Sequence, residues 1–206
     1  MALVSDKFTR INFLYNINDL NNLISIFEHG ILSKNSLRKK RIKTYIDISN
    51  SEVQKRREEK NVPNHASLHS YANLYIDARN PMMYFEVMTR DIDSLCVICV
   101  DKRILDLDNV VVTDRNAAAE FAQFEEPKNA IKFLDFDKIF AKYWTHPCPI
   151  TQSELKAIKC AEVLVLDKIP VSYLIKIKVA TNKAKVHVEQ MHLNVPVEID
   201  SNIFFR

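Results

Sequence analysis

The sequence has no long apolar segment. Its longest uninterrupted apolar run is the six-residue LCVICV at 95–100, far short of the roughly 20 residues that span a bilayer. The N-terminal MALVSDKFTR also lacks the apolar core of a signal peptide. A chain of 206 residues, 47% of them hydrophobic, is nevertheless long enough to bury a core. We therefore expect one domain over residues 1–206, soluble, cytoplasmic and not bound to a membrane.

Cysteine pairs with metal-binding spacing are almost absent. The one CxxC spacing, CVIC at 96–99, lies inside an apolar strand-like run, and no second half-site accompanies it. His65 and His69 are four residues apart, but they flank a loop broken by proline and not a helix. We therefore predict buried structural cysteines, histidines that are polar loop residues, and no metal site.

Glycine occurs once, as Gly30. Apolar residues at helical spacing between 20 and 27 predict a helix that follows a strand at 11–15, with Asn18 or Asp19 as its N-cap. A helix end often needs a left-handed residue, and glycine adopts that conformation without a steric penalty. We expect Gly30 to end this helix.

Positive charge is concentrated near the N-terminus. The net charge is only +3, but RKKRIK at 38–43 holds five basic residues in six and follows the expected helix end. This run predicts an exposed loop. It either keeps the protein soluble, which is the commoner role, or contacts phosphates.

The remaining patterns mix strands and helices without regular alternation, which favours an α+β fold. The expected strands are 71–77, 95–100, 109–113, a run around Glu162, 173–179, 184–190 and 202–205. The expected helices begin at a Ser51–Gln54 capping box and at Asp114 and Asp135, covering 114–124 and 134–144. A loop is expected at 145–154, where two prolines occur without periodicity.

Glu162 and an adjacent pair of arginines are the first two candidates for a functional site, and Glu162 contradicts its surroundings. Glu162 lies in KCAEVLVLDKIP, a run that otherwise favours a buried strand, so it is either a strand-end residue paired with a lysine such as Lys159, or a functional carboxylate. Arg56 and Arg57 are adjacent on a helix and point about 100° apart, so that one can face inward and hold an anion such as a pyrophosphate. The alternative for both arginines is a solvated face paired with neighbouring glutamates.

Three asparagines cluster where the first strand meets the first helix: Asn16, Asn18 and Asn22. Free N–H groups at a helix N-terminus attract anions, and amide side chains can hydrogen-bond a nucleotide. Helix capping accounts for at least one of them without a ligand.

The order of these motifs resembles the DarT-type toxins, ADP-ribosyltransferases that move ADP-ribose from NAD+ onto a base of single-stranded DNA and are paired with a macrodomain antitoxin. The fragments that carry the resemblance are LYNINDLNNLISIFEHGIL, VQKRR, LHSYANLYIDARNPMMY, VVVTDRNAAAEFAQF, KYW and CAEVLVLDKIP. The resemblance implies an α+β domain with an ADP-ribosyltransferase-like split β-sheet core and surrounding helices. It also implies NAD+ as the donor, no metal, and a monomer when free.

The resemblance further implies a set of site residues. Glu162 would be the catalytic glutamate, with Arg57 as the active-site arginine near NAD+, and the segment from Thr145 to Lys159 would be a loop that presents the acceptor. The remaining NAD+ contacts would be Tyr15, Asn16, Asn18, Asn22 and Tyr75. The remaining DNA contacts would be Arg79, Arg115, Asn116, His146, Lys39, Lys40 and Arg41.

One departure from the family pattern concerns the donor site. Members of this family commonly begin with Tyr-His-x-Thr, whereas this chain has Tyr15-Asn16-Ile17-Asn18. The replacements keep hydrogen-bonding capacity while changing its geometry. Two alternatives therefore stay open: the same site modifies RNA, or the chain is a catalytically silent module that binds nucleotides or nucleic acid.

Overall fold

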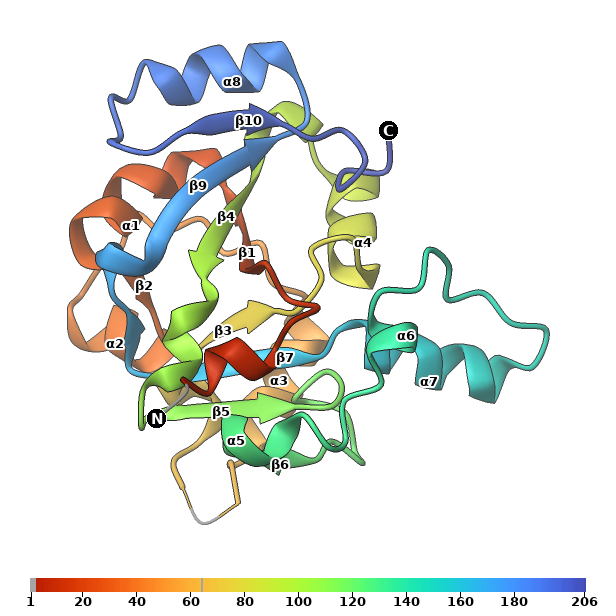
Figure 1. Cartoon of the computed structure of the whole chain (residues 1–206). Coiled ribbons are helices and arrows are strands. Elements are labelled where there is room, and N and C mark those ends of the chain that lie inside the picture. The colour runs from red at the N-terminus through yellow and green to blue at the C-terminus, as the bar shows by residue number, and fades with distance from the viewer. Residues whose placement is uncertain (1–2, 64) are drawn as a thin grey trace.

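Strands from distant parts of the chain meet in one sheet in the computed structural model, which describes residues 3–63 and 65–206. Eight strands lie in the order β10-β9-β4-β1-β3-β7-β5-β6, and β2 pairs with β8 in a second, small sheet (Figure 1). The strands are β1 Phe13–Asp19, β2 Ile31–Leu32, β3 Tyr71–Tyr75, β4 Leu95–Asp101, β5 Val110–Thr113, β6 Phe124–Glu125, β7 Glu162–Leu166, β8 Lys168–Ile169, β9 Leu174–Val179 and β10 Val197–Ile199.

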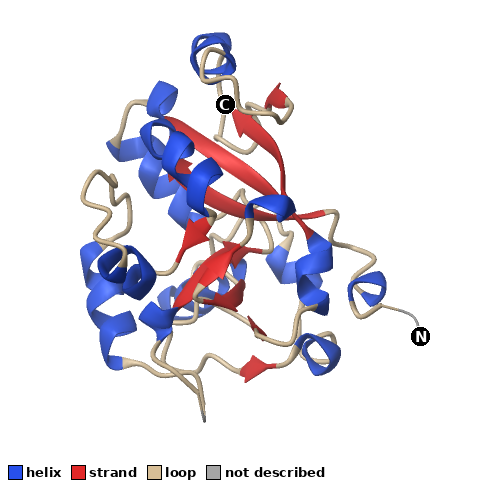
Figure 2. Ribbon diagram, turned by 90° about the vertical axis from the view of Figure 1, so that its left-hand side faces the viewer, coloured by secondary structure: helices blue, strands red, loops and turns tan. Residues whose placement is uncertain are grey.

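Helices lie around the large sheet (Figure 2). They are α1 Leu23–His29, α2 Lys34–Lys39, α3 Ser51–Glu59, α4 Pro81–Thr89, α5 Pro127–Ala130, α6 Phe136–Ile139, α7 Pro149–Lys159 and α8 Asn182–Glu189. Within the part of the chain that the structure describes, no helix is long and apolar enough to cross a membrane.

The sheet is split between β1 and β3. Seven residue pairs join β1 to β4 and five join β3 to β7, but β1 and β3 share only the pair Tyr15–Tyr75. The halves β10-β9-β4-β1 and β3-β7-β5-β6 therefore diverge on either side of one contact. The predicted α+β fold with a split sheet is confirmed.

The core is centred on β4. Leu95 to Val100 are fully buried, because β4 lies between β1 and β9 and an all-apolar strand can be covered on both faces. Cys96 and Cys99 are free and buried in this strand, which confirms the structural role expected for the CVIC run.

Gly30 ends α1 as expected. Its φ is +85°, and a Cβ atom there would lie 2.3 Å from the carbonyl oxygen of Ile169, so only glycine fits. The elements before Gly30 begin later than expected. The strand expected at 11–15 is β1, which runs from Phe13 to Asp19, and a 3₁₀ turn follows it. The Asp19 side chain caps that turn by accepting from the Asn21 N–H, and α1 itself begins at Leu23.

Two of the expected strands are wrong. Residues 184–190 lie largely in α8, whose N-cap Thr181 accepts from the Ala184 N–H. The alternation of apolar and polar residues in this segment also places Ala184 and Val188 four apart, and these two are the residues that α8 buries. Residues 202–205 form turns, in which Ile203 and Phe204 are buried.

The loop expected at 145–154 ends at Cys148, because α7 begins at Pro149. Proline suits the first turn of a helix, where its missing N–H has no partner to lose. The implied acceptor loop from Thr145 to Lys159 is therefore mostly a helix, which projects from the body of the protein at the right of Figure 1.

The expected helix at 114–124 is also wrong, because turns and the short strand β6 occupy this segment. Asp114 accepts from the Gln123 N–H and so closes a loop instead of capping a helix. Asp135 does cap α6 as expected, but α6 covers only Phe136–Ile139 of the helix expected at 134–144. For α3 the N-cap is Asn50, one residue before the predicted capping box.

Candidate active site

Glu162 is a buried carboxylate with strong hydrogen-bond donors. It is the first residue of β7, opposite Tyr75 of β3, and its exposure is 0%. Its Oε2 atom lies 2.9 Å from Nη1 of Arg57, and its Oε1 accepts the Ala117 N–H at 3.0 Å. A carboxylate can remain buried when a cation and a backbone N–H replace its water.

The partner of Glu162 is Arg57 and not a lysine. Arg57 is 5% exposed on α3, while Arg56 faces solvent, which confirms that one of the two adjacent arginines points inward. Lys159, the alternative partner expected from the sequence, instead contacts the Asp77 carboxylate and donates to the Ile139 carbonyl oxygen. The lysine-pairing interpretation is therefore wrong.

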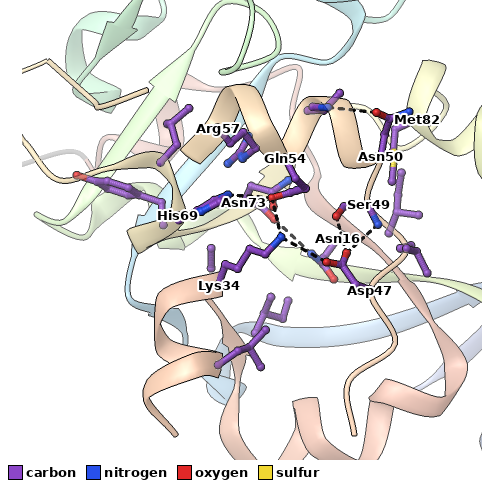
Figure 3. Close-up of a pocket in the computed structure, with 18 of the residues that line it drawn as sticks. Asn16, Lys34, Asp47, Ser49, Asn50, Gln54, Arg57, His69, Asn73 and Met82 are labelled. Atoms are coloured by element: carbon purple, nitrogen blue, oxygen red, sulfur yellow. Dashed lines mark hydrogen bonds and ion pairs between the residues drawn. The ribbon is translucent and has the colours of Figure 1, made fainter. Parts of the chain in front are cut away.

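A cavity of about 560 Å³ lies over the split in the sheet (Figure 3). Its wall comes from β1 and β3, from α2, α3 and the start of α4, and from the segment 42–50 between α2 and α3. Arg57, Tyr75 and Asn116 are in this wall. Glu162 is fully buried and reaches the cavity through its contact with Arg57.

One wall of the cavity is cationic. Lys34 Nζ donates to Gln54 Oε1 at 3.3 Å and pairs with Asp47 at 3.5 Å (Figure 3). Arg38, on the same helix as Lys34, is also in this wall. His69 Nε2 lies 3.1 Å from the same Gln54 oxygen. Burial lowers the pKa of His69, and the positive charges of Lys34, Arg57 and Arg38 lower it further. This wall is suited to an anion.

Sequence reasoning missed several residues of this wall, although the spacing of Gln54 from Arg57 was a signal for one of them. Gln54 lies three residues before Arg57 on α3, so an inward-facing Arg57 brings Gln54 to the same face of the helix. His69 was expected to be a polar loop residue, yet it is 6% exposed in the turn that leads into β3. Lys34 precedes the basic run at 38–43 that the sequence singled out, and Arg38 is the first residue of that run.

The three asparagines form a hydrogen-bonded row. Asn18 Nδ2 donates to Asn16 Oδ1 at 2.9 Å, and Asn22 Nδ2 donates to Asn18 Oδ1 at 2.8 Å. Asn22 also donates to the Ile46 carbonyl oxygen and accepts the Ile46 N–H, which fastens the 42–50 segment over the cavity. Only Asn16 reaches the cavity wall. The expectation that one of the three caps a helix is wrong, because Asn22 precedes α1 without a capping hydrogen bond from its side chain, and Asp19 caps the 3₁₀ turn before it.

The two predicted tyrosines have different positions. Tyr75 lines the cavity, and burial followed by the charge of Glu162 raises its pKa, so it is a neutral hydroxyl at pH 7. Tyr15 lies outside the cavity wall and packs edge-to-face on Phe13. Tyr45 in the 42–50 segment, which the sequence did not single out, lines the cavity, and burial raises its pKa to about 12.

The residues predicted to contact DNA are not gathered at one place. Asn116 lines the cavity, but Arg115 is paired with Asp114 at 2.9 Å, and Arg79 stacks on Phe205 with its guanidinium carbon 4.0 Å from the ring centroid. His146 is exposed and accepts the Cys148 N–H.

The predicted basic patch is exposed at the C-terminal end of α2 and just beyond it, so the expected loop is partly helical. Its members singled out for DNA are Lys39, Lys40 and Arg41. Among residues 3–63 and 65–206, no group of three His, Cys, Asp or Glu side chains is placed to hold a metal ion.

The fold that carries this site is similar to the folds of solved DarT structures. Thermosipho africanus DarTG in complex with ADP-ribose matches with a TM-score of 0.82 and 25% identity, over 94% of this chain and 51% of that chain. Thermus sp. 2.9 DarT in complex with ADP-ribosylated ssDNA matches with a TM-score of 0.80 and 22% identity, over 96% and 98%. The same DarT in complex with NAD+ gives 0.74 and 20%, over 96% and 99%.

Residues 15–205 match the family model described as ssDNA thymidine ADP-ribosyltransferase, DarT, and the chain belongs to this family. A DNA ADP-ribosyl transferase-DNA ADP-ribosyl glycohydrolase fusion protein of Thermosipho africanus (strain H17ap60334) is 30% identical over 96% of this chain and 50% of its own length. A DNA ADP-ribosyl transferase of Thermus aquaticus (strain ATCC BAA-2747 / Y51MC23) is 28% identical over 89% and 82%. The chain thus spans about half of the first relative and most of the second.

Proposed function

We propose that this protein transfers ADP-ribose from NAD+ to a nucleobase of single-stranded DNA. The observation that carries the proposal is the fully buried Glu162, bound to Arg57 at the wall of a cavity of about 560 Å³. That volume lies within the roughly 300–1,000 Å³ typical of small-molecule sites. The names of the relatives support the proposal, since both are described as DNA ADP-ribosyl transferases.

The cavity wall has groups for each part of a dinucleotide. Lys34 and Arg38 would neutralise the pyrophosphate, because both are cationic and lie on the same helix in that wall. Asn16 and the protonated hydroxyl of Tyr45 provide hydrogen bonds that do not depend on pH near neutrality. These residues therefore fit NAD+ although Asn16 and Asn18 replace the histidine and threonine common in the family.

Glu162 and Arg57 would carry the reaction. In the transfer the bond between the ribose C1′ and nicotinamide breaks, and a bond from C1′ to a base nitrogen forms. The Glu162 carboxylate would stabilise the positive charge that develops on the ribose and take the proton that the base nitrogen loses. The Arg57 guanidinium would hold the pyrophosphate or the acceptor at attack distance. Its present contact with Glu162 keeps the carboxylate covered, so we infer that substrate draws Arg57 aside.

The acceptor base would enter the cavity beside Asn116, which is in its wall. A base in a single strand enters such a pocket without the cost of leaving a duplex. The exposed residues Lys39, Lys40 and Arg41 would contact backbone phosphates outside the cavity.

Incubation of the protein with NAD+ and thymidine- or guanosine-containing oligonucleotides tests the proposal. The same sequences are offered as single-stranded DNA, duplex DNA and RNA, and each is analysed by mass spectrometry. We expect single-stranded DNA to gain the mass of one ADP-ribose and the other two to gain none. Modification of RNA alone would assign the site to RNA, and no mass gain on any substrate would leave a silent binding module.

We also propose that the modification makes the protein a toxin, whose partner is a macrodomain-type antitoxin that removes ADP-ribose from DNA. The fusion of a glycohydrolase to a transferase in the Thermosipho relative supports this pairing. Expression of the chain in bacteria should arrest growth, and co-expression of a DNA ADP-ribosyl glycohydrolase should restore it. Growth that continues while modified DNA accumulates would contradict the toxin role.

A further inference from the structure

The turn at residues 116–119 holds one of the two donors of Glu162, and its own position depends on three neighbouring elements. The Asn116 N–H donates to the Ala157 carbonyl oxygen of α7 at 2.8 Å, and the Ala117 N–H donates to Glu162 Oε1 of β7 at 3.0 Å. At the other end of the turn, the ammonium of Lys60 donates to the carbonyl oxygen of Ala119. Lys60 is thus the attachment that comes from α3.

Lys60 follows the last residue of α3 and lies three positions after Arg57. The last turn of α3 supplies the guanidinium that pairs with Glu162, and the residue directly after α3 supplies the ammonium that fastens the turn. The Lys60 ammonium also lies 5.3 Å from the centre of the Phe124 ring, so it contacts the chain on both sides of the 120–123 segment. This placement fixes the distance between the turn and Arg57.

The Asn116 carboxamide depends on the same turn. Its Oδ1 accepts the Ala118 N–H at 2.9 Å, which leaves the amide nitrogen as the group that can donate to a substrate in the cavity. A shift of the turn would thus move both a donor to Glu162 and a side chain of the cavity wall. Displacements of about 1 Å near a reacting centre can cost up to about 100-fold in rate.

We propose that Lys60 is a positioning residue: its ammonium holds the 116–119 turn so that the Ala117 N–H orients the Glu162 carboxylate when substrate draws Arg57 aside. This inference rests on the proposed transferase function. It assigns to Lys60 no contact with NAD+ or DNA, so it predicts an effect on turnover and not on donor binding.

The test compares Lys60→Met, which keeps the apolar stem and removes the charge, with Lys60→Arg, which keeps a cationic donor. Lys55→Met on the same helix is the control, because Lys55 is exposed. We expect Lys60→Met to lower kcat on single-stranded DNA about tenfold while KM for NAD+ changes less than about twofold. Lys60→Arg should recover most of kcat, and Lys55→Met should match the wild type.

Hydrogen exchange of the Ala117 amide, measured by NMR on the same proteins without substrate, separates this inference from the proposed function. We expect faster exchange in Lys60→Met and unchanged exchange in Lys60→Arg and Lys55→Met. Wild-type protein that modifies no oligonucleotide would refute the transferase function and leave the exchange result to decide the role of Lys60. Unchanged exchange or unchanged kcat in Lys60→Met would overturn the inference, as would a loss that Lys60→Arg does not restore.

Discussion

Nη1 of Arg57 lies 2.9 Å from Oε2 and 3.3 Å from Oε1 of Glu162, and the two side chains are only 7% and 0% exposed. A pair buried this far is costly to separate, because either charge alone would lack both water and a partner. The pair links α3 to β7 and therefore contributes to stability as well as to the proposed chemistry.

Arg57→Ala should destabilise the fold by about 3 kcal/mol, because it leaves the Glu162 carboxylate buried without its cation. Adding Glu162→Gln should recover part of this loss, since the remaining side chain is neutral. Urea unfolding of both single variants and the double variant gives the coupling free energy, which we expect to exceed about 1 kcal/mol. Arg56→Ala, at the exposed neighbour, is the matched control, and strictly additive losses would contradict the account.

The basic residues of the cavity wall and the exposed basic residues at the end of α2 should have separable effects on NAD+ binding and on DNA binding. Lys34→Ala and Arg38→Ala, in the cavity wall, should each weaken NAD+ binding about tenfold through the loss of a charge-assisted contact. The triple alanine variant of Lys39, Lys40 and Arg41 should leave NAD+ affinity unchanged. It should reduce the slope of log affinity for single-stranded DNA against log salt concentration by about two. Calorimetry with NAD+ and DNA titrations at several salt concentrations check both results, and an unchanged slope would assign the exposed residues to solubility alone.

His69 should make stability depend on pH. Its pKa is lowered in the folded protein, chiefly by burial, from the ordinary value of 6.5. Below pH 6.5, His69 is protonated in the unfolded chain but stays neutral in the folded protein until the pH reaches its lower folded pKa. The free energy of unfolding therefore decreases as the pH falls towards the folded pKa. Between about pH 7 and pH 5 the wild type should therefore lose more unfolding free energy than His69→Gln. Parallel curves for the two proteins would show that His69 is not responsible.

Local patterns predicted the elements in which one signal dominates. The uninterrupted apolar run predicted β4, because such a run is stable only when it is buried. The lone Gly30 predicted the end of α1, because glycine is the residue that adopts a positive φ without strain. The segment at 184–190 has two periodicities, and packing of Ala184 and Val188 selects the helix. The proline at 149 suggests a loop when the helix that follows it is not considered.

The candidate site could be located from the sequence but not completed. The sequence singled out Glu162 as a charge in an apolar strand and Arg56 and Arg57 as a pair of which one could face inward, and the family resemblance then pointed to Glu162 and Arg57. Their contact joins residues 105 positions apart, which no local pattern specifies. Arg79 and Arg115 were predicted to bind phosphates, but the fold provides Phe205 and Asp114 as their partners. The contact of Arg79 with Phe205 arises from the tertiary structure, whereas Asp114 is the sequence neighbour of Arg115.

The most direct test is Glu162→Gln, assayed for NAD+ binding by calorimetry and for transfer by the mass of a single-stranded DNA oligonucleotide. The substitution keeps the size of the side chain and removes its charge and its capacity to take a proton. We expect NAD+ to bind nearly as it does to the wild type while the oligonucleotide gains no ADP-ribose. Transfer at the wild-type rate in this variant would contradict the assignment of Glu162 as the catalytic carboxylate.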